Sequence, residues 1–176
     1  MLERFETLAD GLDHPEAVTV GPDGLIYAGG EAGQIYRIGA AGAVETLGTT
    51  GGFLYGIVLD GAGRVYGCDM GRQEIVRFDP ATGAADSYSP GTFRRHLRVP
   101  NFACFDDAGN LYVTDSGEWG ADDGLLFRIA PGGETSVWSE ETRAFPNGCC
   151  LTADGDALLV VESRGRRVAR IPTASC

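Results

Sequence analysis

At 176 residues and a net charge of −11, the chain is long enough for one sizeable hydrophobic core and is strongly acidic. The negative charge argues against binding to nucleic acid or to an anionic membrane surface, because both would repel it. The N-terminal segment MLERFETLADG lacks the basic start and apolar run of a signal peptide. No apolar stretch approaches the roughly 18 residues of a membrane span. We therefore expect a cytoplasmic protein of undetermined oligomeric state that binds neither nucleic acid nor membrane.

Four stretches of the chain resemble one another, with spacings of 39, 46 and 46 residues. Each contains a polar anchor residue just before an apolar strand, and a glycine follows eight positions after the anchor. The anchors are Glu16, Tyr55, Asn101 and Asn147. A period of this length, made of short strands and tight turns, indicates a β-propeller. Equivalent positions in a propeller surround one axis, so the anchors are expected to meet where a cation or small molecule binds.

Each repeat predicts a blade of antiparallel strands joined by glycine-containing turns. The first strands are predicted at 17–20, 56–59, 102–105 and 148–151, and the second at 25–29, 64–68, 110–114 and 157–161. The third strands, each with an arginine, are predicted at 35–38, 75–78, 126–129 and 168–171, and more polar fourth strands at 43–47, 84–88 and 134–138. The predicted fold class is therefore all-β, a propeller of four-stranded blades in one domain over 1–176. Its repeats lie near 9–48, 49–89, 96–139 and 142–176.

The two ends of the chain leave two architectures open. Residues 3–8, ERFETL, resemble a fourth strand that precedes any first strand. In a four-bladed ring, this strand would pair with residues 167–171 and close the circle. In a larger ring, about four blades of six are present and the domain is incomplete at its C-terminus, which is the arrangement we expect.

Two insertions interrupt the repeat. Residues 89–98 insert before the third blade and carry a concentrated positive charge, from Arg94, Arg95, His96 and Arg98. This loop either covers the axial pocket and contacts an anionic or carbonyl group, or is simply solvated. Residues 116–124 lengthen the turn after the second strand of blade three.

The cysteines and histidines show no metal-binding spacing, and no G-x-S-x-G motif is present. The five cysteines are Cys68, Cys104, Cys149, Cys150 and Cys176. We interpret them as free thiols in a reducing cytoplasm, and those at 104, 149 and 150 as small core residues. His14 and His96 are interpreted as isolated. Asp69 and Asp115, at the ends of second strands, are predicted to bond to neighbouring turns.

The chain resembles the SMP-30/gluconolactonase/LRE family, in a superfamily that also contains strictosidine-synthase-like proteins. The motifs that carry the resemblance are PEAVTVGPDGLIY, PNFACFDDAGNLYVTDSG and FPNGCCLTADGDALLVVES. The resemblance implies a six-bladed propeller with one divalent cation on its axis, which hydrolyses sugar and other lactones. By that resemblance, Glu16 and Asn147 would be metal ligands, and Asn101 would face both metal and substrate.

The chain also departs from the family pattern at several positions. The family's general base is an Asp about one blade beyond Asn147, past the last residue of this sequence, and Asp115 is the reserve candidate for that role. Relatives commonly have Asp-Gly after the middle Asn, where this chain has Phe102 and Ala103. They often have Arg two positions before it, where Val99 stands and Arg98 lies one step further away. Arg98 and Tyr55 are the further candidates for substrate contact.

The predicted chemistry needs few groups. A hard cation held by carboxylate and amide oxygens would polarise a lactone carbonyl and lower the pKa of the bound water that attacks it, and a carboxylate would take the proton. Ca²⁺ is the first choice, with Zn²⁺, Mn²⁺ and Mg²⁺ as alternatives. Pro-Asn-Gly is also a plain turn motif. Two other functions therefore stay open: a non-catalytic propeller that binds a ligand or protein, and a strictosidine-synthase-like hydrolase.

Overall fold

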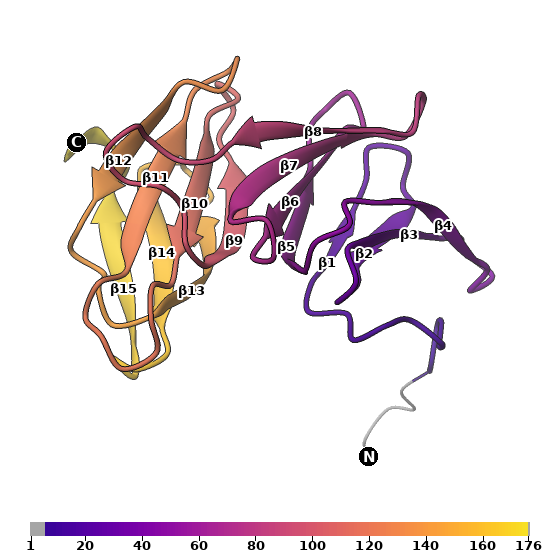
Figure 1. Ribbon diagram of the computed structural model, residues 1–176, viewed down its shortest axis with the longest axis horizontal. Coiled ribbons are helices and arrows are strands. Elements are labelled where there is room, and N and C mark those ends of the chain that lie inside the picture. The colour runs from indigo at the N-terminus through magenta and orange to yellow at the C-terminus, as the bar shows by residue number, and fades with distance from the viewer. Residues whose placement is uncertain (1–5, 176) are drawn as a thin grey trace.

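The computed structural model describes residues 6–175, which form four antiparallel sheets arranged as successive propeller blades (Figure 1). Blade one contains β1 (Val18–Val20), β2 (Ile26–Gly29), β3 (Gln34–Ile38) and β4 (Val44–Thr49). Blade two contains β5 (Leu54–Leu59), β6 (Val65–Asp69), β7 (Glu74–Asp79) and β8 (Ala84–Ser89). Blade three contains β9 (Pro100–Phe105), β10 (Leu111–Asp115), β11 (Leu125–Ile129) and β12 (Thr135–Ser139). Blade four contains β13 (Pro146–Leu151), β14 (Ala157–Glu162) and β15 (Arg167–Pro172), followed by the short 3₁₀ helix η1 (Thr173–Ser175).

The turn between the first two strands of each blade depends on the glycine that recurs in the repeat. Gly24, Gly63, Gly109 and Gly155 all adopt a left-handed backbone, with φ between 73° and 82°. Each donates its N–H to the carbonyl oxygen three residues earlier, at 2.9–3.0 Å. A residue with a Cβ would be strained at this φ. The glycine therefore sets the hairpin that starts each blade.

The hydrophobic core lies between neighbouring blades. Leu54 and Phe78 of blade two pack with Ile35 of blade one in one cluster. The next two clusters fill the spaces between blades two and three and between blades three and four. The inner strands β1, β5, β9 and β13 are neighbours in that order. The blades therefore fan out around one side, where the inner strands meet.

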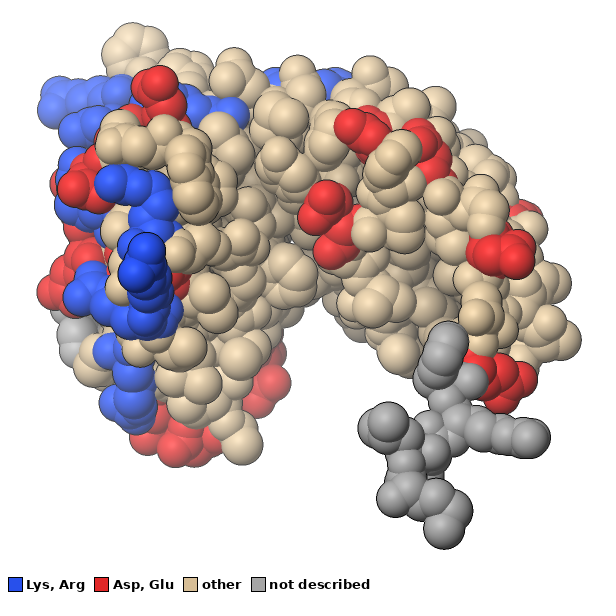
Figure 2. All heavy atoms as spheres, turned by 90° about the horizontal axis from the view of Figure 1, so that it is seen from below, with Lys and Arg blue, Asp and Glu red and all other residues tan. Residues whose placement is uncertain are grey.

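The described chain forms an open arc, as the space-filling view shows (Figure 2). Arginine side chains gather on the part of this face where the C-terminal blades lie, and acidic side chains are spread over both parts of the face. Five of the 14 arginines fall between residues 143 and 170. None of the helices in residues 6–175 has the length and apolar character needed to cross a membrane.

Two predictions about the ends and the core need correction. The strand expected over residues 3–8 falls partly outside the described residues, and its described part, 6–8, forms no strand. Within residues 6–175, β15 pairs with β14 alone, so the closed four-bladed ring is not formed. Cys150 is exposed and not a core residue, because it lies on the face of β13 opposite the buried Cys149.

Candidate metal and substrate site

The four anchors line a single cavity of about 350 Å³ where the inner strands meet. Glu16 lies two residues before β1, whereas Tyr55, Asn101 and Asn147 are each the second residue of an inner strand. The rest of the wall consists of Phe102, Phe145 and Gly148. The structure thus brings together four residues that are far apart in the chain and share one position in the repeat.

A β-bulge surrounds three of these anchors. In blade two the register shifts between Leu54 and Ile57, so that Tyr55 and the residue after it oppose a single residue of β6. Equivalent shifts occur at Asn101, opposite the end of β10, and at Asn147, between Pro146 and Cys149. A bulge bends the strand and changes the direction of the side chain at the extra residue. The bulges therefore place these polar side chains in the cavity and not in a regular pleat.

A buried carboxylate at the end of the second strand holds the chain that leads to each of these bulges. Asp69 accepts the N–H of Phe53 at 2.9 Å. Asp115 accepts the N–H groups of Arg98, Val99 and Gly117 at 2.7, 2.9 and 3.1 Å. The predicted bonds of Asp69 and Asp115 to neighbouring turns are therefore present.

Glu162 does the same in blade four, where it accepts the N–H of Ala144 at 2.9 Å. Sequence reasoning missed this residue, because it stands one position later in its repeat than Asp69 and Asp115 in theirs. Glu162 lies opposite Pro146 in the strand pairing, just as Asp115 lies opposite Pro100. An acidic residue at the end of a second strand was the available signal.

The amide of Asn147 has a defined orientation. Its Nδ2 donates to Ser163 Oγ at 3.2 Å, which leaves its carbonyl oxygen for the cavity. Within residues 6–175, no hydrogen bond or ion pair engages the side chains of Glu16 or Asn101. Glu16 is exposed, and the other anchors are half-buried. The cavity therefore presents one carboxylate and two amide groups whose oxygens are available to a ligand.

Two other predicted site residues lie outside the cavity wall. Arg98 Nη2 forms an ion pair with Asp123 Oδ2 at 2.7 Å and also donates to the Asp123 carbonyl oxygen at 3.1 Å. The insertion over 89–98 folds back on itself through a bridge between Gly91 and His96. Asp115 is buried and bonded to backbone N–H groups. Neither Arg98 nor Asp115 lines the cavity.

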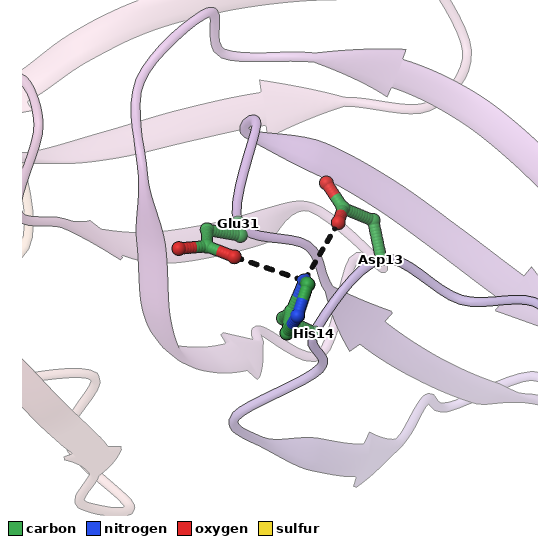
Figure 3. A group of neighbouring side chains, drawn as sticks. All are labelled: Asp13, His14 and Glu31. Carbon is green, nitrogen blue, oxygen red and sulfur yellow. Dashed lines mark hydrogen bonds and ion pairs between the residues drawn. The ribbon is translucent and has the colours of Figure 1, made fainter.

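His14 has close partners, contrary to the interpretation of it as isolated (Figure 3). Its Nδ1 lies 2.9 Å from Asp13 Oδ1 and 2.9 Å from Glu31 Oε2. The hydrogen bond to Asp13 and the charge of Glu31 raise the pKa of His14, and the pKa of Asp13 is lowered in turn. The cluster is exposed and stands next to Glu16, whose charge also favours the protonated ring. Glu31 lies just after β2 and is distant from His14 in the sequence, so no local sequence motif indicated that the two residues would be in contact.

Two thiols on the inner strands β9 and β13 form a close pair. Cys104 Sγ and Cys149 Sγ are 4.0 Å apart, on neighbouring blades. Their contact lowers the pKa of Cys104 and raises that of Cys149, and burial raises the latter further. Burial also raises the pKa of Cys68. These groups belong to the packing between blades and do not line the cavity.

Solved structures with the same fold include two enzymes with different activities. A gluconolactonase from Xanthomonas campestris is 20% identical over 94% of this chain and 60% of its own, with a TM-score of 0.82. Virginiamycin B lyase from Staphylococcus aureus, solved with quinupristin, is 22% identical over 91% of this chain and 53% of its own, with a TM-score of 0.73. The chain thus spans between about half and three fifths of these proteins. At a sequence identity this low, the structural match shows only that these proteins share the propeller fold with the chain.

Family profiles match both parts of the chain. A profile of the N-terminal part of strictosidine synthase-like proteins matches residues 1–38. The profile of the SMP-30/gluconolactonase/LRE-like region matches residues 88–175, which is half of the chain. The comparison with curated proteins gives no match. On the evidence of the fold and of the longer profile match, the chain belongs to the SMP-30/gluconolactonase/LRE-like family.

Proposed function

We propose that the axial cavity hydrolyses lactones of sugars or related compounds with the help of one divalent cation. The observation that carries this proposal is the convergence of Glu16, Asn101 and Asn147 on one cavity. Turn chemistry accounts for one such residue at a time, but not for three oxygen-bearing side chains brought to one place from three blades. The gluconolactonase with the same fold supports the choice of reaction.

The donor set suits a hard cation. Glu16 supplies a negative charge, and the amide oxygens of Asn101 and Asn147 are neutral ligands that do not titrate. The hydrogen bond from Asn147 Nδ2 to Ser163 aims the matching oxygen at the cavity. Oxygen ligands favour Ca²⁺, Mg²⁺ or Mn²⁺, and Zn²⁺ also accepts them. When bound, such a cation polarises a carbonyl and lowers the pKa of water.

The protein side chains then bind and orient the lactone. Asn101 also lines the cavity, so that while its amide oxygen is a proposed ligand, its amide N–H can donate to the ring oxygen or carbonyl oxygen of a substrate. The Tyr55 hydroxyl offers a second hydrogen bond from blade two. Asp115 is not assigned as the general base, because its carboxylate accepts three backbone N–H groups and lies outside the cavity wall.

Metal binding tests the donor set independently of turnover. We expect Ca²⁺ to raise the melting temperature of the wild-type chain, and we expect Glu16→Gln and Asn147→Ala to abolish this rise. Glu134→Gln is the matched control, because Glu134 is exposed and lies outside the cavity wall. Retention of the full rise in both cavity variants would overturn the assignment. Lactone hydrolysis is then measured with and without a chelator.

A binding propeller without catalysis is the second candidate. Among residues 6–175, Glu16 is the one carboxylate that lines the cavity, so this part of the chain supplies no second carboxylate there to move a proton. The lyase with the same fold also shows that this scaffold serves more than one chemistry. Metal binding without turnover of any lactone would favour this candidate over the hydrolase.

A further inference from the structure

We propose that Cys104 and Cys149 form a site of reversible oxidation, at which a disulfide bond joins blade three to blade four. The observation behind it is the distance of 4.0 Å between the two sulfur atoms, which belong to different blades and to residues 45 positions apart in the chain. The inference concerns the contact between two blades, so it depends neither on the cation nor on the lactone.

The two inner strands turn both thiols into the same space between blades. In β9, Ala103 packs in one cluster with Cys68 of blade two, whereas Cys104 packs in another with Cys149 of blade four. Side chains alternate along a strand, so the position of each cysteine in its strand sets the direction of its sulfur. The same alternation turns Cys150 to the opposite, exposed face of β13. Cys104 and Cys149 are therefore paired selectively.

The path from two thiols to one disulfide is short. Bonded sulfur atoms lie about 2 Å apart, so those of Cys104 and Cys149 must approach each other by about 2 Å. No atom fits between two sulfur atoms that are 4.0 Å apart, so nothing has to be displaced from the path. The strands β9 and β13 are already in contact. Rotation of the two side chains about their Cα–Cβ bonds then supplies movement without a rearrangement of the blades.

The two thiols differ in reactivity and in access. The contact with Cys149 lowers the pKa of Cys104; burial opposes this change, and the backbone N–H of Leu151 lowers the pKa further. Cys104 is half-buried, whereas Cys149 is buried. A cavity of about 360 Å³ is lined by Phe105 and Asp106, which follow Cys104 in the chain, and by Leu151. Because the thiolate is the reactive form of cysteine, we expect an oxidant to attack Cys104 first.

Hydrogen peroxide is the oxidant of this reaction. The Cys104 thiolate attacks one peroxide oxygen, the O–O bond breaks, and hydroxide leaves as Cys104 becomes a sulfenic acid. The sulfur of Cys149 then attacks the sulfenic sulfur, the S–O bond breaks, and the oxygen leaves as water with the proton of the Cys149 thiol. The hydroxide takes up the proton that Cys104 lost on ionising. Two thiols and one peroxide thus give one disulfide and two water molecules, and a thiol reductant reverses the change by exchange.

The disulfide fastens two inner strands close to the axis. Cys104 stands three residues after Asn101, and Cys149 stands two residues after Asn147, so the bond joins the strands that carry these two anchors. It also closes a long loop of chain, which restricts the unfolded state more than the folded one. Oxidation should therefore stabilise the contact between blades three and four.

The test treats the native, reduced chain with a small excess of hydrogen peroxide. The remaining thiols are blocked with N-ethylmaleimide, and digestion without a reductant, followed by mass spectrometry, locates any disulfide. Cys149→Ala and Cys150→Ser are matched variants of adjacent residues, because the first removes the proposed partner and the second removes the exposed thiol beside it. The same treatment in urea shows which pairs the unfolded chain forms. Thermal unfolding compares the oxidised and reduced forms.

We expect the disulfide between Cys104 and Cys149 in most wild-type and Cys150→Ser chains, and its loss on treatment with dithiothreitol. Disulfides of Cys104 should be at least ten-fold rarer in Cys149→Ala. The oxidised wild-type chain should melt about 5 °C or more above the reduced one. The inference is wrong if Cys104 stops at sulfinic acid, if it pairs with Cys150 instead, if the native chain gives no more of the bond than the unfolded chain, or if the bond leaves the melting temperature unchanged. The wild-type result decides these points even if Cys149→Ala does not fold.

Discussion

Asp115 provides a direct test of how the site is held, because a structural role as a backbone cap and a catalytic role as a general base predict different effects of its substitution. The structure makes its carboxylate a cap for three backbone N–H groups, at 2.7, 2.9 and 3.1 Å. Asp115→Ala leaves all three without this acceptor. Each loss costs about 1–3 kcal/mol, and the low end applies to Arg98 and Val99, whose amides can regain water. The three losses together lower the free energy of unfolding by about 3–5 kcal/mol. A typical domain has an unfolding free energy of about 5–15 kcal/mol, so this is a large share of its stability.

Urea unfolding followed by circular dichroism measures this loss. With a slope of about 2 kcal/mol per molar urea, the midpoint of Asp115→Ala should fall by about 2 M. Asp107→Ala is the control, since Asp107 is exposed and should shift the midpoint by little. Asp115→Asn keeps one acceptor oxygen and should fall between the two. A midpoint for Asp115→Ala within about 0.3 M of wild type would refute the capping role. If the wild-type chain hydrolyses a lactone as proposed, loss of that hydrolysis at unchanged stability in Asp115→Asn would make Asp115 a candidate base again.

Two further predictions follow from the titratable groups. The pKa of His14 should lie above its ordinary value of 6.5 in an NMR titration and should fall in Asp13→Asn and Glu31→Gln; an unshifted wild-type value would contradict the cluster. Because folding raises this pKa, protonated His14 stabilises the fold below the ordinary value, and the contribution is lost as pH rises through the elevated one. Iodoacetamide should label exposed Cys150 in the native protein and spare Cys68, whose burial raises its thiol pKa. Mass spectrometry after digestion checks both sites, and fast labelling of Cys68 without denaturant would speak against its burial.

Most of the fold was predictable because the same short-range sequence features recur in each repeat. A glycine at the φ-positive position of each hairpin and an apolar strand on either side are enough to place the blades. The strand starts were less well placed. The anchors were predicted to precede the inner strands, whereas Tyr55, Asn101 and Asn147 lie within them. The difference arises from the bulges, which interrupt the pairing at these residues and have no fixed sequence signature.

The site was predictable only as far as repeat symmetry reaches. Symmetry indicated that the four anchors would share one cavity, which they do. It could not assign a partner to a side chain outside the repeat. The pairing of Arg98 with Asp123 and the contact of Trp119 with Phe145 both involve the insertion over 116–124. Loops of this kind acquire their contacts from tertiary packing, so their partners are found only in the folded chain.

The carboxylate caps have a consequence for how such a scaffold diversifies. Asp69, Asp115 and Glu162 bind main-chain N–H groups, so the path of the chain beside the axis does not depend on which side chains it carries. A blade can therefore exchange its axial side chain by single substitutions, while the cap that shapes the strand stays in place. The residues that shape the fold and the residues that determine the chemistry of the cavity can therefore change independently of one another. The same fold serves a gluconolactonase and a lyase, each of which shares only 20–22% of its residues with this chain.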